Sequence, residues 1–188
     1  MRKLKLQVQM SIDGFIAGPN GEMDWMTFNW GDDLNKYVQS LTENVDCILL
    51  GRKLAEGFIP HWAAVAADAE NPEHETGKMF SHMPKVVFSH TLAESTWPDT
   101  CLAKGELVEE VNKLKAQQGK DMIAYGGAEF VSSLIKHKLI DEYFLFVNPV
   151  VLGKGKPIFS TLEDKLPLQL INTQAFECGI MLQHFKQN

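Results

Sequence analysis

Two adjacent glycines, Gly126 and Gly127, separate a predicted strand from a predicted helix that begins with Ala128 and Glu129. Paired glycines allow the backbone to approach a phosphate closely. The unpaired N–H groups at the start of the following helix point toward the same place, with the positive end of the helix dipole behind them. The segment therefore predicts an anion site, with a plain tight turn between strand and helix as the alternative.

Two further strand ends carry groups suited to phosphate. Gly51 ends a short apolar run and precedes Arg52 and Lys53, which would lie in the first turn of a helix. Cations are unfavourable there unless an anionic ligand bridges them, and the alternative is a pair of solvated surface charges. Ser89 and His90 follow a third apolar run. Because ligands of open α/β sheets bind outside the carboxyl ends of the strands, the three junctions predict a ligand with several phosphates, such as a dinucleotide.

The elements that position these junctions alternate along the chain. Apolar runs and alternating apolar residues predict strands over residues 4–10, 47–50, 85–89, 121–125, 143–147, 168–176 and 180–185. Apolar residues at helical spacing predict helices over residues 32–45, 52–58, 106–116 and 128–137. Residues 59–84 contain Pro60, Pro72 and Pro84 and predict an irregular excursion with a small helix. This order indicates an α/β fold with a mostly parallel sheet and an antiparallel C-terminal edge.

Length and composition favour one globular domain over residues 1–188. A chain that is 45% hydrophobic and 22% charged has the composition of an ordinary packed domain, and at this length it can bury about 70% of its unfolded surface. The net charge of −6 argues against a nucleic-acid partner. The N-terminal residues alternate instead of forming a signal peptide, and no apolar run is long enough to span a membrane. A cytoplasmic protein without a membrane partner is therefore expected.

Cysteine and histidine spacing predicts no metal. The three cysteines, Cys47, Cys101 and Cys178, show no CxxC pattern, and the six histidines show no HxxxH or HxH pattern. We therefore expect reduced, mostly packing cysteines and no metal site.

Taken together, these motifs resemble the dihydrofolate-reductase-like superfamily, and most closely the reductase domain of bacterial riboflavin biosynthesis. The resemblance spans nearly the whole chain. It rests on the order and spacing of Met10–Ala17, Gly51–Lys53, Val87–Ser89, Gly126–Ala128, Leu139–Glu142 and Asn148–Gly155. It implies a three-layer αβα sandwich and an NADPH cofactor.

The resemblance also assigns cofactor contacts to residues of this chain. Ile16 and Ala17 would lie against the nicotinamide and its ribose. Arg52 and Lys53 would hold the 2′-phosphate and the pyrophosphate, Ser89 would join the 2′-phosphate site, and the segment Gly126–Glu129 would cradle the pyrophosphate. Dihydrofolate reductases usually carry a hydroxyl residue where this chain has Leu54, and a second cation near His90. One phosphate contact is therefore missing or made by backbone alone.

On the substrate side the chain departs from true dihydrofolate reductases, which carry a carboxylate on the helix after a Trp-containing loop. Aligning Trp25 places Trp30 at that position, and Asp32 or Asp33 would replace the carboxylate only if the loop were shifted. Ser11, Asp13 and Gly14 fit the riboflavin-type pattern instead. The resemblance thus implies an NADPH-dependent reductase, acting by hydride transfer on a planar heterocyclic or ribosylaminouracil-type substrate. Dihydrofolate reductase proper and a non-catalytic nucleotide-binding module are the alternatives.

Candidate groups for the reaction lie in the N-terminal quarter. Asp13, Asp24 or water would supply the proton, with a turn residue bonding its own backbone as the alternative role of Asp13. Ser11, Trp25 and Trp30 are the candidate substrate contacts. A wider aromatic set would either wall a pocket for a planar substrate or belong to the core: Trp25, Phe28, Trp30, Phe58 and Trp62. The C-terminal edge hairpin must be covered, which favours a homodimer.

Overall fold

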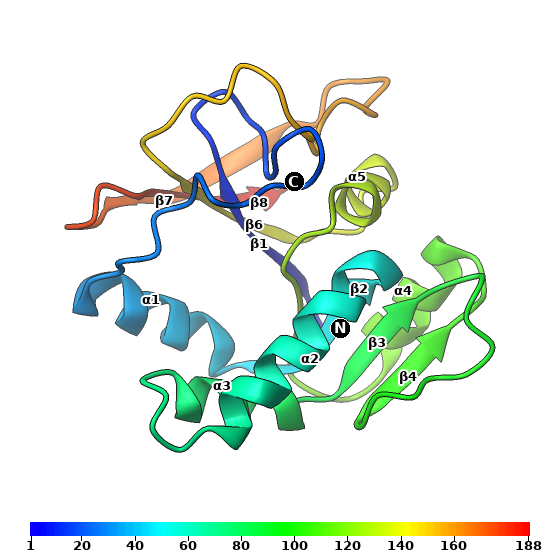
Figure 1. Cartoon of the computed structure of the whole chain (residues 1–188). Helices are drawn as coiled ribbons and strands as arrows, with labels where there is room; N and C mark the ends of the chain where they lie inside the picture. The colour runs from blue at the N-terminus through cyan, green and yellow to red at the C-terminus, as the bar shows by residue number, and fades with distance from the viewer.

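Strands and helices alternate through most of the chain and build one eight-stranded sheet with helices on both faces (Figure 1). The computed structural model describes residues 1–188. Its strands are β1 (Leu4–Met10), β2 (Val45–Gly51), β3 (Lys85–Phe88), β4 (Thr100–Ala103), β5 (Asp121–Ala124), β6 (Glu142–Val147), β7 (Leu168–Ala175) and β8 (Met181–Gln187). Its helices are α1 (Asp32–Thr42), α2 (Arg52–Ala67), α3 (His74–His82), α4 (Leu107–Ala116) and α5 (Ala128–Lys136).

The strand order is β4-β3-β2-β5-β1-β6-β8-β7. Every pair from β4 to β6 is parallel, whereas β8 runs antiparallel to both β6 and β7. This arrangement confirms the predicted sheet, mostly parallel with an antiparallel C-terminal hairpin. At the β7 edge, Leu170 and Ile171 are 54% and 48% exposed. In the predicted homodimer a second copy would cover this edge. The homodimer stays a prediction.

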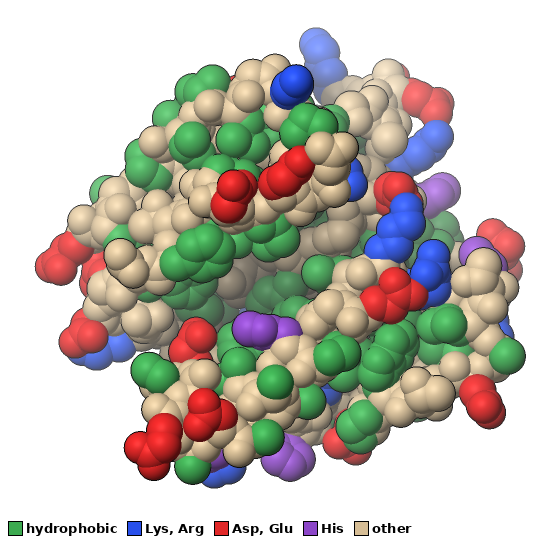
Figure 2. Space-filling view, in the orientation of Figure 1, with side chains coloured by type: hydrophobic (Ala, Val, Ile, Leu, Met, Phe, Trp, Pro, Cys, Tyr) green, Lys and Arg blue, Asp and Glu red, His purple; other side chains and the backbone are tan.

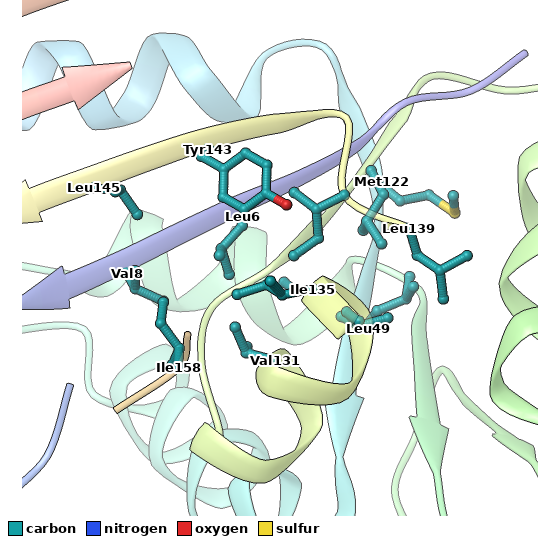
Figure 3. Packing of buried hydrophobic residues seen from close by; sticks show 14 of the residues in the cluster. Leu6, Val8, Leu49, Met122, Val131, Ile135, Leu139, Tyr143, Leu145 and Ile158 are labelled. Atoms are coloured by element: carbon teal, nitrogen blue, oxygen red, sulfur yellow. The ribbon is translucent and has the colours of Figure 1, made fainter. Parts of the chain in front are cut away.

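The three layers follow from alternation of side chains along the strands. On β2, Cys47 and Leu49 belong to the largest hydrophobic cluster, which also contains buried residues of α4 and α5. Ile48 and Leu50 point to the opposite face, into a second cluster with buried residues of α2 and α3. A third cluster lies between α1 and the strands β6 and β8. Figure 3 shows the largest cluster, where side chains of β1, β6 and α5 interdigitate.

Residues 52–84 contain more helix than predicted. Helix α2 continues through Pro60 to Ala67, and α3 follows it. Proline lacks an N–H group and removes one hydrogen bond from the helix. Pro60 is exposed, however, while Ile59 and Val65 on the same helix are buried. Packing of this apolar face holds the helix together past the proline.

Two smaller differences concern residues at element boundaries. Val45 begins β2 instead of ending the first helix, because α1 stops at Thr42. The edge strand β4 was not predicted at all. Its four residues form a run too short to stand out in the sequence, and only Ala103 is buried. None of the five helices combines the length and the apolar character that a membrane span requires.

Candidate active site

A cleft of about 1550 Å³ opens at the carboxyl ends of the parallel strands. Figure 2 shows this cleft as a hollow across the face of the molecule. Hydrophobic side chains lie inside the hollow, and basic and acidic side chains meet at one end of it. Every residue predicted to contact the cofactor lines this cleft: Ile16, Ala17, Gly51, Arg52, Lys53, Ser89, His90, Gly126, Gly127, Ala128 and Glu129. The junctions come together because β3, β2 and β5 are neighbours in the sheet.

The junction between β5 and α5 has the backbone of an anion site. Gly127 precedes the first residue of α5 with φ of 79° and ψ of 92°, in a region that residues with side chains rarely adopt. No side chain caps this helix end, so its first N–H groups have no side-chain acceptor. A Cβ at Gly127 would lie 3.6 Å from Leu54 Cβ, an ordinary contact distance. Glycine is therefore required here by the backbone conformation and not by a lack of space for a side chain.

At the junction between β2 and α2, glycine is required by close packing. A Cβ at Gly51 would come within 2.8 Å of Phe130 Cβ on α5, so only glycine lets the two helix starts lie this close. Helix α2 also lacks a side-chain cap and has no acidic residue in its first turn. Two uncapped helix N-termini thus face one cleft.

The two cations of this junction have carboxylate partners within the chain. Arg52 Nη1 donates to Glu56 Oε1 at 2.6 Å, and Lys53 Nζ donates to both carboxylate oxygens of Glu129 at 3.0 and 3.1 Å. The hydrogen bond and the charge of Lys53 lower the pKa of Glu129. All four side chains are at least 35% exposed. Exposed pairs of this kind are weak, so an anionic ligand can replace the carboxylates as partner of either cation.

Ser89 shapes the third junction. Its buried hydroxyl oxygen accepts hydrogen bonds from the backbone N–H groups of Thr91 and Leu92 at 3.2 and 3.1 Å. These bonds fold the chain back at the end of β3 and leave His90 and Thr91 exposed on the wall of the cleft. Ser89 thereby positions its neighbours as well as lining the cleft.

Ser11 and Asp13 do not line the cleft. Ser11 donates a hydrogen bond of 2.7 Å to Asp13, and Asp13 also accepts from the backbone N–H groups of Leu152 and Gly153 at 3.1 and 2.7 Å. These hydrogen bonds, the one from Ser11 foremost, lower the pKa of Asp13. The carboxylate ties the loop after β1 to residues 152–153. Asp13 thus has a structural role of the kind given above as the alternative to proton donation, and this role also involves a second loop.

Three residues of the loop before α1 were predicted to act in proton donation or substrate contact, and one of them lines the cleft. Asp24 and Trp25 do not line it, and the indole N–H of Trp25 donates to Glu22 O within the loop at 3.0 Å. Trp30 lines it, and its indole N–H donates to Thr27 O at 2.6 Å. From the predicted aromatic set, Phe28, Phe58 and Trp62 line the cleft as well. An aromatic wall is therefore present without Trp25.

Among the polar residues at the cleft that sequence reasoning missed, three lie on or directly after central strands. Gln7 and Gln9 on β1 and Tyr125 after β5 all line the cleft. Tyr125 stacks on Phe58 with ring centroids 5.7 Å apart, and its hydroxyl is buried without a hydrogen-bond partner. Burial raises the pKa of Tyr125 far above its ordinary value, so the hydroxyl stays protonated. The available signal was the position of two glutamines on a strand that lies inside the sheet.

The site fits a dinucleotide cofactor. Pockets for drug-sized ligands have volumes of about 300–1,000 Å³, and this cleft exceeds that range. Two uncapped helix N-termini and the cations Arg52 and Lys53 suit the phosphates. Ile16 and Ala17 supply an apolar surface for a ring. The residues that would hold NADPH are therefore those of the three junctions and of the segment after β1.

The sheet order gives the chain a dihydrofolate-reductase-like fold. The fold matches dihydrofolate reductase from Enterococcus faecalis, solved with NADP(H), with a TM-score of 0.64 and 14% identity over 99% of this chain and 96% of that one. It also matches a Thermotoga maritima diaminohydroxyphosphoribosylaminopyrimidine deaminase/5-amino-6-(5-phosphoribosylamino)uracil reductase. That match has a TM-score of 0.71 and 20% identity, over all of this chain and 57% of that one.

Within this fold class, the chain belongs to the RibD C-terminal domain family, whose model matches residues 2–182. The uncharacterized protein YyaP of Bacillus subtilis (strain 168) is 35% identical over 182 residues, covering 96% of this chain and 92% of YyaP. The riboflavin biosynthesis protein RibD of Corynebacterium ammoniagenes is 24% identical over 163 residues, or 84% of this chain and 48% of RibD. A Shewanella sp. PV-4 structure assigned to riboflavin biosynthesis has a TM-score of 0.74 and 25% identity over nearly the full length of both chains.

Proposed function

We propose that this protein is an NADPH-dependent reductase that transfers a hydride to a planar heterocyclic substrate of the ribosylaminouracil type. The observation that carries this proposal is the convergence in one cleft of two strand-to-helix junctions, β2–α2 and β5–α5, and the loop after β3, with every residue predicted for the cofactor. Membership of the RibD C-terminal domain family supports this proposal, because the relative RibD is a riboflavin biosynthesis protein.

In this proposal the chain binds and aligns, and the bound cofactor supplies the hydride. The start of α5 and the cations Arg52 and Lys53 hold the phosphates. Ile16 and Ala17 hold the nicotinamide against the part of the cleft lined by Trp30. Close alignment of the nicotinamide with the reducible carbon of the substrate, which in a ribosylaminouracil is C1 of the ribosyl group, is the main requirement for this transfer. Because Asp13 and Asp24 do not line the cleft, we propose water as the proton donor.

The experiment that tests the function has two stages. NADPH is first titrated into the protein by calorimetry, and the absorbance of the reduced nicotinamide is then followed after addition of 5-amino-6-(5-phosphoribosylamino)uracil. We expect binding with a Kd in the micromolar range or below, followed by consumption of NADPH. Binding without consumption of NADPH by this or related pyrimidines would favour the non-catalytic nucleotide-binding module. Absence of binding would overturn the proposal.

Dihydrofolate is expected to be a poor substrate. The candidate carboxylates on α1 do not line the cleft, and Asp33 instead accepts hydrogen bonds from the backbone N–H groups of Leu34 and Glu177 at 2.7 and 2.9 Å. Neither carboxylate of α1 is therefore placed to bind and protonate a pterin. An assay with NADPH at neutral pH should give turnover far below the typical enzyme range of about 1–1,000 per second. Turnover within that range would show that another acid fills the role.

A further inference from the structure

Two glutamine side chains form the polar part of the cleft floor. On β1, Leu4, Leu6, Val8 and Met10 pack in the largest hydrophobic cluster. Because side chains alternate along a strand, Gln7 and Gln9 point to the opposite face. There they lie between the cluster under α2 and α3 and the cluster under α1, where both line the cleft. A strand inside a sheet that is covered on both faces would ordinarily carry apolar residues at such positions.

A hydrogen-bonded chain sets the direction in which the Gln9 amide points. The backbone N–H of Thr27 donates to Asn148 Oδ1 at 2.9 Å, so the oxygen of this fully buried amide is an acceptor. Asn148 Nδ2 must then be the donor, and it donates to Gln9 Oε1 at 2.8 Å. The Gln9 oxygen is thereby occupied, and its Nε2 is left as a donor. The Gln9 amide therefore presents N–H to the remaining space.

Both glutamines carry an unsatisfied atom. Gln9 Nε2 and Gln7 Oε1 are each buried without a hydrogen-bond partner, and Gln7 is only 7% exposed. Buried polar groups in proteins are almost always paired, so an unpaired donor and an unpaired acceptor two residues apart on one strand require an explanation. A ligand that offers an acceptor to Gln9 Nε2 and a donor to Gln7 Oε1 would satisfy both.

The polarity of the pair itself favours an uncharged ligand ring. A carboxylate placed at the pair would meet the Gln7 oxygen, which is itself an acceptor. A ring with a C=O next to an N–H matches both atoms, because C=O accepts from Gln9 Nε2 and N–H donates to Gln7 Oε1.

We propose that Gln7 and Gln9 select, for the reductase proposed above, a neutral substrate ring that carries adjacent C=O and N–H groups, as in a lactam or imide. Asn148 is a positioning residue that fixes the Gln9 donor and joins it to the loop containing Thr27. The rest of the substrate extends from this edge toward the nicotinamide side of the cleft.

Uracil and 1,3-dimethyluracil test the proposal with the intact protein. Uracil offers the C=O and N–H edge, whereas the dimethyl compound keeps the ring and both carbonyls but has no N–H. Ligand-observed NMR titration should show uracil binding, with 1,3-dimethyluracil roughly tenfold or more weaker, the effect of losing one hydrogen bond at a buried site. Equal affinity of the two compounds, or failure of uracil to bind, would overturn the proposal.

The variant Gln9→Glu isolates the donor. Glutamate has the same size and still accepts from Asn148, but it carries no N–H group at neutral pH. We expect roughly tenfold weaker uracil binding. Gln169→Glu, which adds the same charge at an exposed position of β7, should leave uracil binding unchanged. Unchanged uracil binding in a folded Gln9→Glu protein would mean that Gln9 Nε2 does not contact the ring and would overturn the proposal.

NADPH titration of the same samples separates this inference from the proposed function. If NADPH binds and the two uracils do not differ, only the ring recognition is wrong. If NADPH does not bind the unmodified protein, the reductase proposal fails, whatever the uracils do. The comparison of the two uracils needs no variant and therefore stands even if Gln9→Glu fails to fold.

Discussion

Replacing Gly127 with valine is expected to weaken NADPH binding by about 100-fold or more, equivalent to about 2.7 kcal/mol, in a protein that remains folded. Gly127 has φ of 79°, where a β-branched residue is strained. Such strain amounts to about 1–3 kcal/mol and is relieved when the backbone turns. Turning the backbone here moves the first N–H groups of α5 away from the phosphates. The valine methyl groups would also fill the space into which a phosphate must come.

The control for this prediction is Gly179→Val. Gly179 has φ of 89°, a Cβ added to it would lie 3.5 Å from Pro149 Cγ, an ordinary contact distance, and it does not line the cleft. It therefore shares the backbone strain without the site. Thermal unfolding by circular dichroism should show similar losses of stability in the two variants, while calorimetry should show lost NADPH binding only for Gly127→Val. Normal NADPH affinity in that variant would remove the β5–α5 junction from the site.

The fold was predictable because its main elements carry local patterns. Alternating apolar and polar residues predicted β1, and a continuous apolar run predicted β2. The elements that were predicted wrongly or missed depend on contacts with residues far away in the sequence. Whether α2 passes Pro60 depends on the sheet beneath it, and the edge strand β4 is defined by hydrogen bonds to β3 more than by apolar residues.

The candidate site divides in the same way. Glycines and cations at strand ends are contiguous motifs, so the residues predicted for the phosphates could be named from the sequence, and the structure brings these residues together. The part of the cleft proposed for the substrate depends on segments far apart in the chain. Gln9 and Asn148 are 139 residues apart in sequence, and Thr27 and Asn148 are 121 apart. Nothing in the local sequence of β1 indicates that its polar face meets them.

Replacing Arg52 with alanine is expected to weaken NADPH binding by about 10- to 100-fold and to leave NADH binding nearly unchanged. The two cofactors differ only by the phosphate on the adenosine ribose, so a preference must come from groups that touch it. A charge-assisted hydrogen bond contributes about 1.5–3 kcal/mol, which corresponds to this change in affinity. The bond of Arg52 to Glu56 competes little, because exposed ion pairs contribute only about 0–1 kcal/mol.

Salt and a matched variant identify the origin of the effect. Added salt should narrow the preference for NADPH in the unmodified protein, because Arg52 is 35% exposed and its charge is partly screened. Lys113→Ala removes an equally ion-paired but more exposed cation, on α4 outside the cleft, and should change neither affinity. If Arg52→Ala weakens both cofactors equally, the guanidinium holds the shared pyrophosphate. If it weakens neither, Arg52 is a solvated residue of the α2 start, and the preference for NADPH must come from Lys53, Ser89 or backbone N–H groups.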